Sequence, residues 1–258
     1  RPVSIGKWTP ARKDGNVLVK QRTIGSEVSF RGKGLHTGLE ATLTLKPAGV
    51  DEGVWFERTD LPGRPRIRAC VENVSDTVRC TTLSQNGVSV HTVEHLMAAL
   101  GGMEIDNLIV SLDSVEVPVA DGSARVFCEM IQKAGIVEQP AKAEYVTLEM
   151  PTWSRRDGSY LVALPADSFK VSFIFANDHP AVGVQYAAFE IEPELFMREI
   201  APARTVGFLS ELEELQSKGL ALGGDYEVAV VVGEQGILNP LRFPDEIVRH
   251  KILDMIGD

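Results

Sequence analysis

Residues 92–101 read TVEHLMAALG and mark the point where the chain changes from a strand-forming to a helix-forming pattern. Four apolar residues of this stretch recur at the spacing i, i+3, i+4 and i+7: Val93, Leu96, Met97 and Leu100. This spacing predicts a helix with one apolar face, and the glycine pair that follows predicts its end. The segments before and after this helix have patterns that predict the rest of the fold.

The sequence on either side of the helix predicts strands followed by helices. Apolar and polar residues alternate over 39–46, which predicts a half-buried strand. In the first half, further strands are predicted at 53–58, 65–72, 77–83, 87–90 and 107–112, with a second helix at 124–135. In the second half, strands are predicted at 144–150, 159–164, 169–176, 182–190 and 227–232, with helices at 193–200, 207–218 and 245–258. This order predicts an α+β fold of two tandem domains with similar topology, each a sheet packed with helices.

The expected boundaries follow from composition. Residues 1–20 are basic and have no apolar period, so a flexible leader is expected there. Residues 21–140 would form the first domain, 137–143 would form a linker, and 144–258 would form the second domain. Because the chain starts at Arg rather than Met and ends inside a predicted helix, it is expected to be a piece of a longer translation product. The second domain is expected to be truncated at its C-terminus.

Composition limits the possible partners. The 258 residues carry 26 Lys and Arg against 36 Asp and Glu, a formal charge of −10, which argues against a general nucleic-acid binder. The longest aliphatic run, 228–232, is far shorter than the roughly 20 residues of a membrane-spanning helix. Three cysteines without CxxC spacing favour a reducing compartment. A cytoplasmic protein without a transmembrane segment is therefore expected. The sequence leaves the oligomeric state open, and a monomer is the expectation.

The first candidate for chemistry is HTVEH, residues 91–95. Glu94 and His95 are adjacent, so they project about 100° apart around a helix, which suits a general base beside a metal ligand. If His91 is also helical, it shares a face with His95, and the string matches the H-x-x-E-H pattern of inverted zinc peptidases. His95 could instead be a surface or core histidine.

The second candidate lies on the predicted last helix. His250 and Asp254 are spaced i and i+4, Asp258 extends the same row, and Lys251 lies beside it. A solvated charged face is the alternative. Taken together, His95, His250 and Asp254 supply the three N and O ligands of a hydrolytic zinc site, which keeps a fourth position open for water. Glu94 would be the general base, and Lys251 would stabilise the developing oxyanion.

Nine strings of the sequence occur in the order and spacing of one known family. They are GKGLHTG (32–38), FERTDLPG (56–63), CTTL (80–83), TVEHLMAAL (92–100), IDN (105–107), EVPVADGSA (116–124), REIAPARTVGF (198–208), LQSKGLALGG (215–224) and LRFPDEIVRHKILDMIGD (241–258). From Gln21 to Asp258, the chain resembles the UDP-3-O-acyl-N-acetylglucosamine deacetylases, zinc amidases that commit bacteria to lipid A synthesis.

The resemblance implies an active site at the junction of the two domains. It implies that His95, His250 and Asp254 bind zinc and that Glu94 is the general base. Acetate would be released from the acetamide of a UDP-linked, acylated glucosamine. The other residues given roles by the resemblance are Thr205 at the tetrahedral intermediate, Lys251 and Asp258 beside the metal, and Phe208 and Leu212 along an acyl-chain passage. The last two are spaced i and i+4 on a predicted helix, so plain core packing is an equal alternative.

Some features depart from the family or stay open. Val206 stands where family members often have Phe, and the family's C-terminal segment with a Gly-His general acid is absent from the sequence. His36 and Cys80 match positions near the site. A structural turn histidine is an equal alternative for His36, and a lone cysteine such as Cys80 is more often a small buried apolar residue. Two other functions remain possible: a truncated, non-catalytic zinc-binding copy, or an inverted-motif zinc peptidase that uses His91. His179, in Asn-Asp-His-Pro, is expected to serve a turn.

Overall fold

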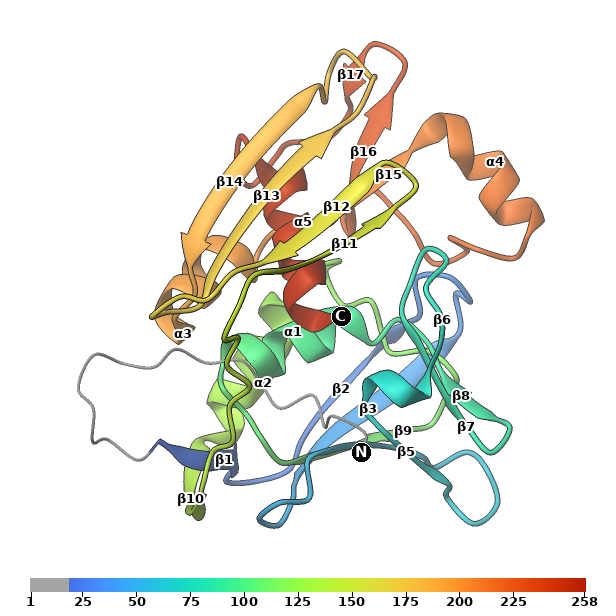
Figure 1. Ribbon diagram of the computed structural model, residues 1–258. Helices are drawn as coiled ribbons and strands as arrows, with labels where there is room; N and C mark the ends of the chain where they lie inside the picture. The colour runs from blue at the N-terminus through green and yellow to red at the C-terminus, as the bar shows by residue number, and fades with distance from the viewer. Residues whose placement is uncertain (1–18) are drawn as a thin grey trace.

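A five-stranded sheet forms one face of the protein in a computed structural model that describes residues 19–258 (Figure 1). The strand order is β2–β3–β9–β4–β5, in which β4 and β9 are parallel and the other pairs antiparallel. The strands are β2 (Val28–Lys33), β3 (Glu40–Pro47), β4 (Val54–Arg58), β5 (Arg66–Arg68) and β9 (Leu108–Leu112). The predicted alternation is confirmed in β3, where Ala41, Leu43 and Leu45 are buried. Leu39 precedes the strand and is exposed.

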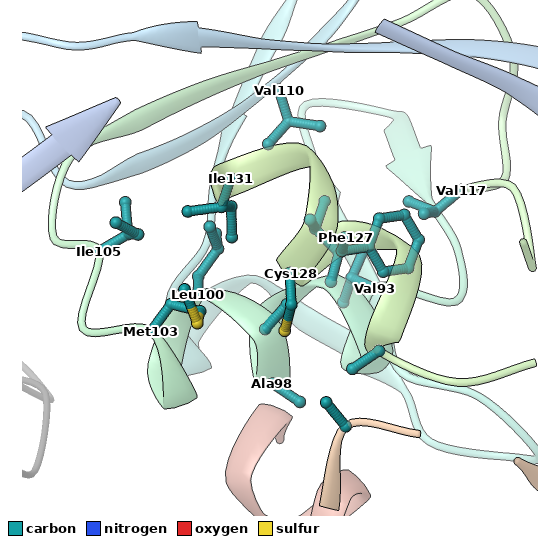
Figure 2. Close-up of a cluster of buried hydrophobic side chains, with 14 of the residues drawn as sticks. Val93, Ala98, Leu100, Met103, Ile105, Val110, Val117, Phe127, Cys128 and Ile131 are labelled. Atoms are coloured by element: carbon teal, nitrogen blue, oxygen red, sulfur yellow. The ribbon is translucent and has the colours of Figure 1, made fainter. Parts of the chain in front are cut away.

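Two helices, α1 (Glu94–Gly102) and α2 (Arg125–Ala134), share one core with this sheet. Figure 2 shows Val110 of β9 beside side chains of both helices, among them Leu100 and Phe127. Nearly all of α1 is buried, including Glu94 and His95, because α5 (Glu246–Gly257) packs on it as well. Truncating a fully buried side chain such as Leu100 to Ala should cost about 2–5 kcal/mol of unfolding free energy.

The second half of the chain surrounds α5. The hairpin of β13 (Lys170–Ala176) and β14 (Val184–Glu190) packs against it. A three-stranded sheet has β15 (Thr205–Phe208) parallel to β16 (Ala229–Gly233), followed by the short strand β17 (Gly236–Ile237). The remaining elements are the hairpin β11 (Thr152–Arg156) and β12 (Ser159–Ala163), α3 (Pro193–Leu195) with the π-helical turn η2 (Phe196–Ile200), and α4 (Leu209–Ser217).

The predicted α+β class is confirmed. The division into two domains stays a prediction, since one buried core contains residues of both, for example Leu96 of α1 and Leu253 of α5. Most of the predicted leader, residues 1–18, lies outside the described residues, and Lys20 already belongs to β1 (Lys20–Ile24). Within residues 19–258, no helix combines the length and the hydropathy needed to cross a bilayer.

Three expected segments, 77–83, 137–143 and 144–150, differ from the structure. The expected linker 137–143 is largely strand β10 (Ile136–Lys142), which pairs with β1. It is mostly exposed and so lacks an apolar face, although buried Gln139 donates to the Ala48 carbonyl. No strand occupies 144–150, and β11 begins only at Thr152. Only Thr82 and Leu83 of the stretch 77–83 lie in a strand. Residues 77–81 connect β6 (Val74–Asp76) to β7 (Thr82–Gln85), and these two strands form a small sheet with β8 (Val88–Val90) after the 3-10 turn η1 (Val71–Asn73).

Candidate metal centre

The three predicted metal ligands lie together where α1 meets α5. Ligand atoms of His95, His250 and Asp254 all lie within 4.8 Å of one another. Asp254 Oδ1 is 3.2 Å from His250 Nε2 and 3.8 Å from His95 Nε2. The two imidazole rings are nearly perpendicular, at 84°, with centroids 4.9 Å apart. Two nitrogens and one carboxylate oxygen therefore converge on one point.

The two helices bring the ligands together in different ways. On α5, the i, i+4 spacing places His250 and Asp254 on one face. His95 comes from the first turn of α1 and approaches from the other side. This approach depends on Gly257, since a Cβ there would overlap the carbonyl oxygen of Glu94. The glycine thus lets the backbone of α5 lie directly on the first turn of α1.

One carboxylate oxygen of Asp254 accepts a hydrogen bond, and the other has no hydrogen-bond partner among the described residues. Its Oδ2 accepts a 2.8 Å hydrogen bond from Lys251 Nζ. Its Oδ1 is buried and has no hydrogen-bond partner in the described part of the chain. Buried polar atoms are almost always paired, so a lone carboxylate oxygen facing two imidazoles calls for a cation. The free oxygen supports the predicted role of Asp254 as a metal ligand.

The imidazoles are prepared for binding a metal. His250 Nδ1 lies 3.0 Å from the Ala203 carbonyl oxygen. Because a carbonyl can only accept, Nδ1 carries the proton and Nε2 keeps its lone pair for a metal. Burial lowers the pKa of His95 to about 3 and also lowers the pKa of His250. Burial alone would raise the pKa of Asp254, but opposing interactions, including the charge and hydrogen bond of Lys251, hold that pKa below its ordinary value.

Glu94, the predicted general base, is the first residue of α1 and is buried. Its Oε2 accepts a 3.0 Å hydrogen bond from the Thr81 backbone N–H. Burial raises the pKa of Glu94 to about 8, and repulsion from Asp254 contributes to the increase. A buried carboxyl group with a perturbed pKa, one residue from a ligand, is suited to proton transfer.

Thr81 is a site residue that the sequence reasoning missed. Besides the backbone bond to Glu94, its hydroxyl donates a 2.6 Å hydrogen bond to Asp258 Oδ1. Thr81 therefore joins the first residue of α1 to the residue that follows α5. The available signal was its place in CTTL (80–83), one of the nine strings that carry the family resemblance.

The predicted substrate residues lie along β15 and α4. Thr205 starts β15 and donates its backbone N–H to the Gly122 carbonyl at 2.8 Å. Phe208 and Leu212 were expected to share one helix, which is wrong: Phe208 ends β15, and α4 starts at Leu209. The pairing of β15 with β16 extends the strand to this residue. Phe208 packs, as Val206 does, against a small apolar cluster that includes Val230.

The zinc-peptidase hypothesis is not supported by the position of His91. Helix α1 begins only at Glu94, and Thr92 has a positive φ of 58°, so His91 and His95 do not share a helical face. His91 instead forms a bridge with Glu116, and its Nε2 is 3.2 Å from Ser89 Oγ. Among the described residues, His91 is not part of the ligand cluster.

Three other residues also lie outside the cluster. Buried His36 donates its backbone N–H to Glu116, and its Nδ1 accepts from Ala221. Cys80 is half-buried, and burial raises the pKa of its thiol. The expected turn role of His179 is confirmed, since its carbonyl accepts the N–H groups of Val182 and Gly183.

Comparison with known proteins agrees with this geometry. The family model described as UDP-3-O-acyl N-acetylglycosamine deacetylase matches residues 21–258. A protein of Syntrophotalea carbinolica named UDP-3-O-acyl-N-acetylglucosamine deacetylase is 46% identical over 93% of this chain and 79% of its own length. Proteins of the same name from Myxococcus xanthus (50% identical, 92% of this chain, 76% of that protein) and Marinobacter nauticus (44%, 93% and 81%) are also similar. The chain thus belongs to the UDP-3-O-acyl N-acetylglycosamine deacetylase family.

Proposed function

We propose that this chain is a zinc-dependent amidohydrolase that removes the acetyl group of UDP-3-O-acyl-N-acetylglucosamine, the committed step of lipid A biosynthesis. The observation that carries the proposal is the cluster of His95, His250 and Asp254 beside the buried carboxyl group of Glu94. The relatives described above are 44–50% identical to this chain over most of its length and are named for this deacetylation.

The ligand cluster fits zinc in number and type. Two neutral imidazoles and one carboxylate are typical of hydrolytic zinc sites, and the unpaired Asp254 Oδ1 supports a cation there. When bound, zinc supplies Lewis acidity, which polarises a carbonyl and acidifies water. Lys251 holds Asp254 by its other oxygen at 2.8 Å, and the Ala203 carbonyl holds His250 at 3.0 Å.

Each of the other site residues has its own role in the hydrolysis. Glu94 accepts the proton of the water that adds to the acetamide carbonyl. The proton is then passed to the amide nitrogen as the C–N bond breaks, which gives acetate and a free amine. Lys251 and Thr205 stabilise the negative charge that develops on the carbonyl oxygen. Asp258 is also assigned a catalytic role, and the Thr81 hydroxyl positions its carboxylate by donating a hydrogen bond to Oδ1.

Phe208 and Leu212 are proposed to contact the acyl chain. Both side chains are half-buried, and they lie on either side of the junction between β15 and α4. Apolar side chains that are only partly covered can exchange water for an acyl chain at low cost. We also propose a cytoplasmic enzyme that acts as a monomer; the absence of disulfides among its three cysteines supports the compartment.

The test measures acetate release from UDP-3-O-acyl-N-acetylglucosamine by the protein as its gene encodes it. Zinc-loaded protein should release acetate, chelation should stop the reaction, and added zinc should restore it. Zinc binding without acetate release would instead favour a non-catalytic zinc-binding protein. Size-exclusion chromatography with light scattering tests the proposed monomer.

A further inference from the structure

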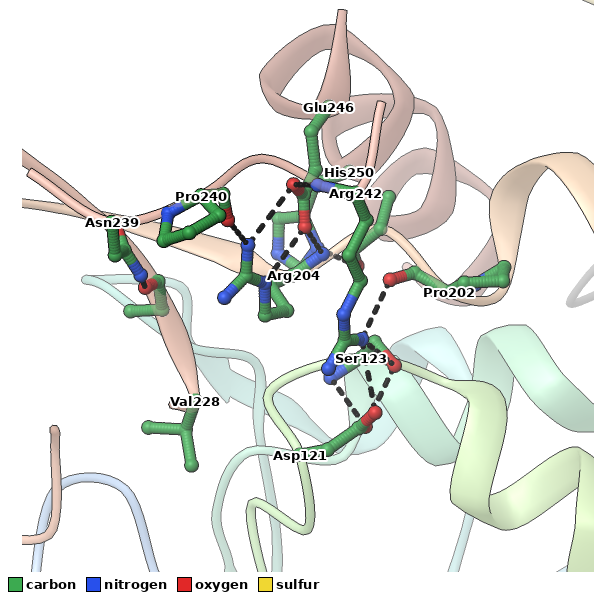
Figure 3. Close-up of polar contacts among 12 residues, drawn as sticks. Asp121, Ser123, Pro202, Arg204, Val228, Asn239, Pro240, Arg242, Glu246 and His250 are labelled. Atoms are coloured by element: carbon green, nitrogen blue, oxygen red, sulfur yellow. Dashed lines mark hydrogen bonds and ion pairs between the residues drawn. The ribbon is translucent and has the colours of Figure 1, made fainter. Parts of the chain in front are cut away.

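A single peptide group lies between two side chains of α5 that are one helical turn apart. The N–H of Arg204 donates to Glu246 Oε1 at 3.0 Å, and the carbonyl of Ala203 accepts from His250 Nδ1 at 3.0 Å. These two groups are the ends of the same peptide unit. Glu246 and His250 are spaced i and i+4, so both face the loop that carries this peptide (Figure 3).

The carboxylate of Glu246, in the first turn of α5, is buried and forms several polar contacts. It is 0% exposed and forms an ion pair with Arg204, whose Nε lies 2.9 Å from Oε1. Its Oε2 accepts from Arg204 Nη2 at 3.2 Å and from the Arg242 backbone N–H at 2.6 Å. A buried ion pair contributes little net stability. Stability therefore gives no sufficient reason for a carboxylate at this position.

The loop is also fastened to the first half of the chain. Arg242 Nη1 donates to the Pro202 carbonyl at 2.8 Å and to Asp121 Oδ2 at 2.9 Å (Figure 3). Residues 202–204 are thereby held on both sides, so the carbonyl of Ala203 has one fixed direction. The imidazole of His250 takes its orientation from that carbonyl.

We propose that Glu246 is a positioning residue for the metal centre, which acts on His250 through the peptide between Ala203 and Arg204. The inference rests on the proposed role of His250 as a metal ligand. Resonance couples the two ends of a peptide group, so a carboxylate at the N–H makes the carbonyl a stronger acceptor. That carbonyl fixes the tautomer and the ring orientation that leave Nε2 for the metal.

The experiment compares zinc dissociation constants, measured by competition with a chromophoric chelator. Glu246→Gln keeps the shape of the side chain but removes its charge. Zinc should bind about 10- to 100-fold more weakly, the usual effect of removing a partner of a metal ligand. Glu199→Gln is the matched control, because Glu199 binds Arg249 of the same helix at 2.7 Å and does not contact the peptide. This control should bind zinc with wild-type affinity.

Zinc binding is read without turnover, so the result does not depend on the deacetylase activity. Folded Glu246→Gln with wild-type zinc affinity would overturn the proposal, and so would an equal loss in Glu199→Gln. If Glu246→Gln does not fold, the double variant Arg204→Met/Glu246→Met replaces the buried pair with apolar side chains. Weaker zinc binding by that variant supports the proposal, and wild-type affinity overturns it.

Discussion

Gly257 of α5 lies directly against the carbonyl oxygen of Glu94 in α1, with no room for a side chain between them. Glu94 precedes the ligand His95, while α5 carries His250 and Asp254. The contact between these two backbones therefore sets the separation of the ligands. Metal binding should depend on that contact as much as on the ligands.

Replacing Gly257 with Ala tests this dependence. The added methyl group overlaps the backbone of α1, so the helices must separate, at a cost of about 1–3 kcal/mol of unfolding free energy. We expect a lower melting temperature and weaker zinc binding, measured by thermal unfolding and chelator competition. Gly101→Ala is the control, because its Cβ would meet Ile256 Cγ2 at an ordinary 3.4 Å. Wild-type zinc affinity in Gly257→Ala would contradict the prediction.

Glu94→Gln separates proton transfer from metal binding. The amide keeps the size of the side chain and can still accept from the Thr81 backbone N–H, so the ligands should stay in place. Zinc content should be unchanged, while kcat should fall by roughly 10²–10⁴, the contribution of a general base. Glu104→Gln, which alters an ion pair with Arg22 beyond the other end of α1, should leave kcat unchanged. Loss of zinc together with rate would argue against the base assignment.

Three histidine variants test the ligand set. His95→Ala and His250→Ala each remove one converging nitrogen and should abolish tight zinc binding. His91→Ala should retain zinc, because this residue precedes α1 and lies outside the cluster. Metal analysis of the purified variants measures the difference. Equal zinc loss in His91→Ala and His95→Ala would restore the inverted-motif hypothesis.

Local periodicity predicted the parts of the fold that depend on one apolar face. The i, i+4 pair of His250 and Asp254 was readable in the same way, since both lie on one helix. The approach of His95 was not, because it depends on a contact between helices far apart in the sequence; family resemblance supplied it. Strand β10 was not predicted because it is mostly exposed and its residues show no alternation of apolar and polar positions. The proposed role of Glu246 could not be predicted from local pattern either, because its partner Arg204 is 42 residues away in the sequence.

Acid sensitivity should depend on Glu57, in the five-stranded sheet. Burial alone would raise its pKa, but hydrogen bonds from Ser111, at 2.8 Å, and Arg66, at 3.1 Å, outweigh burial and lower it. A lowered pKa stabilises the folded state above the ordinary value of 4.5, and this stability is lost as the pH falls through the folded-state pKa. Glu57→Gln should therefore cost on the order of 1–3 kcal/mol of unfolding free energy at neutral pH and progressively less in acid. Urea unfolding across this pH range measures the difference. Glu40→Gln, which alters an exposed pair with Arg31, is the control and should show little effect at any pH. A constant difference between wild type and Glu57→Gln from neutral to acid pH would show that the charge of Glu57 does not stabilise the fold.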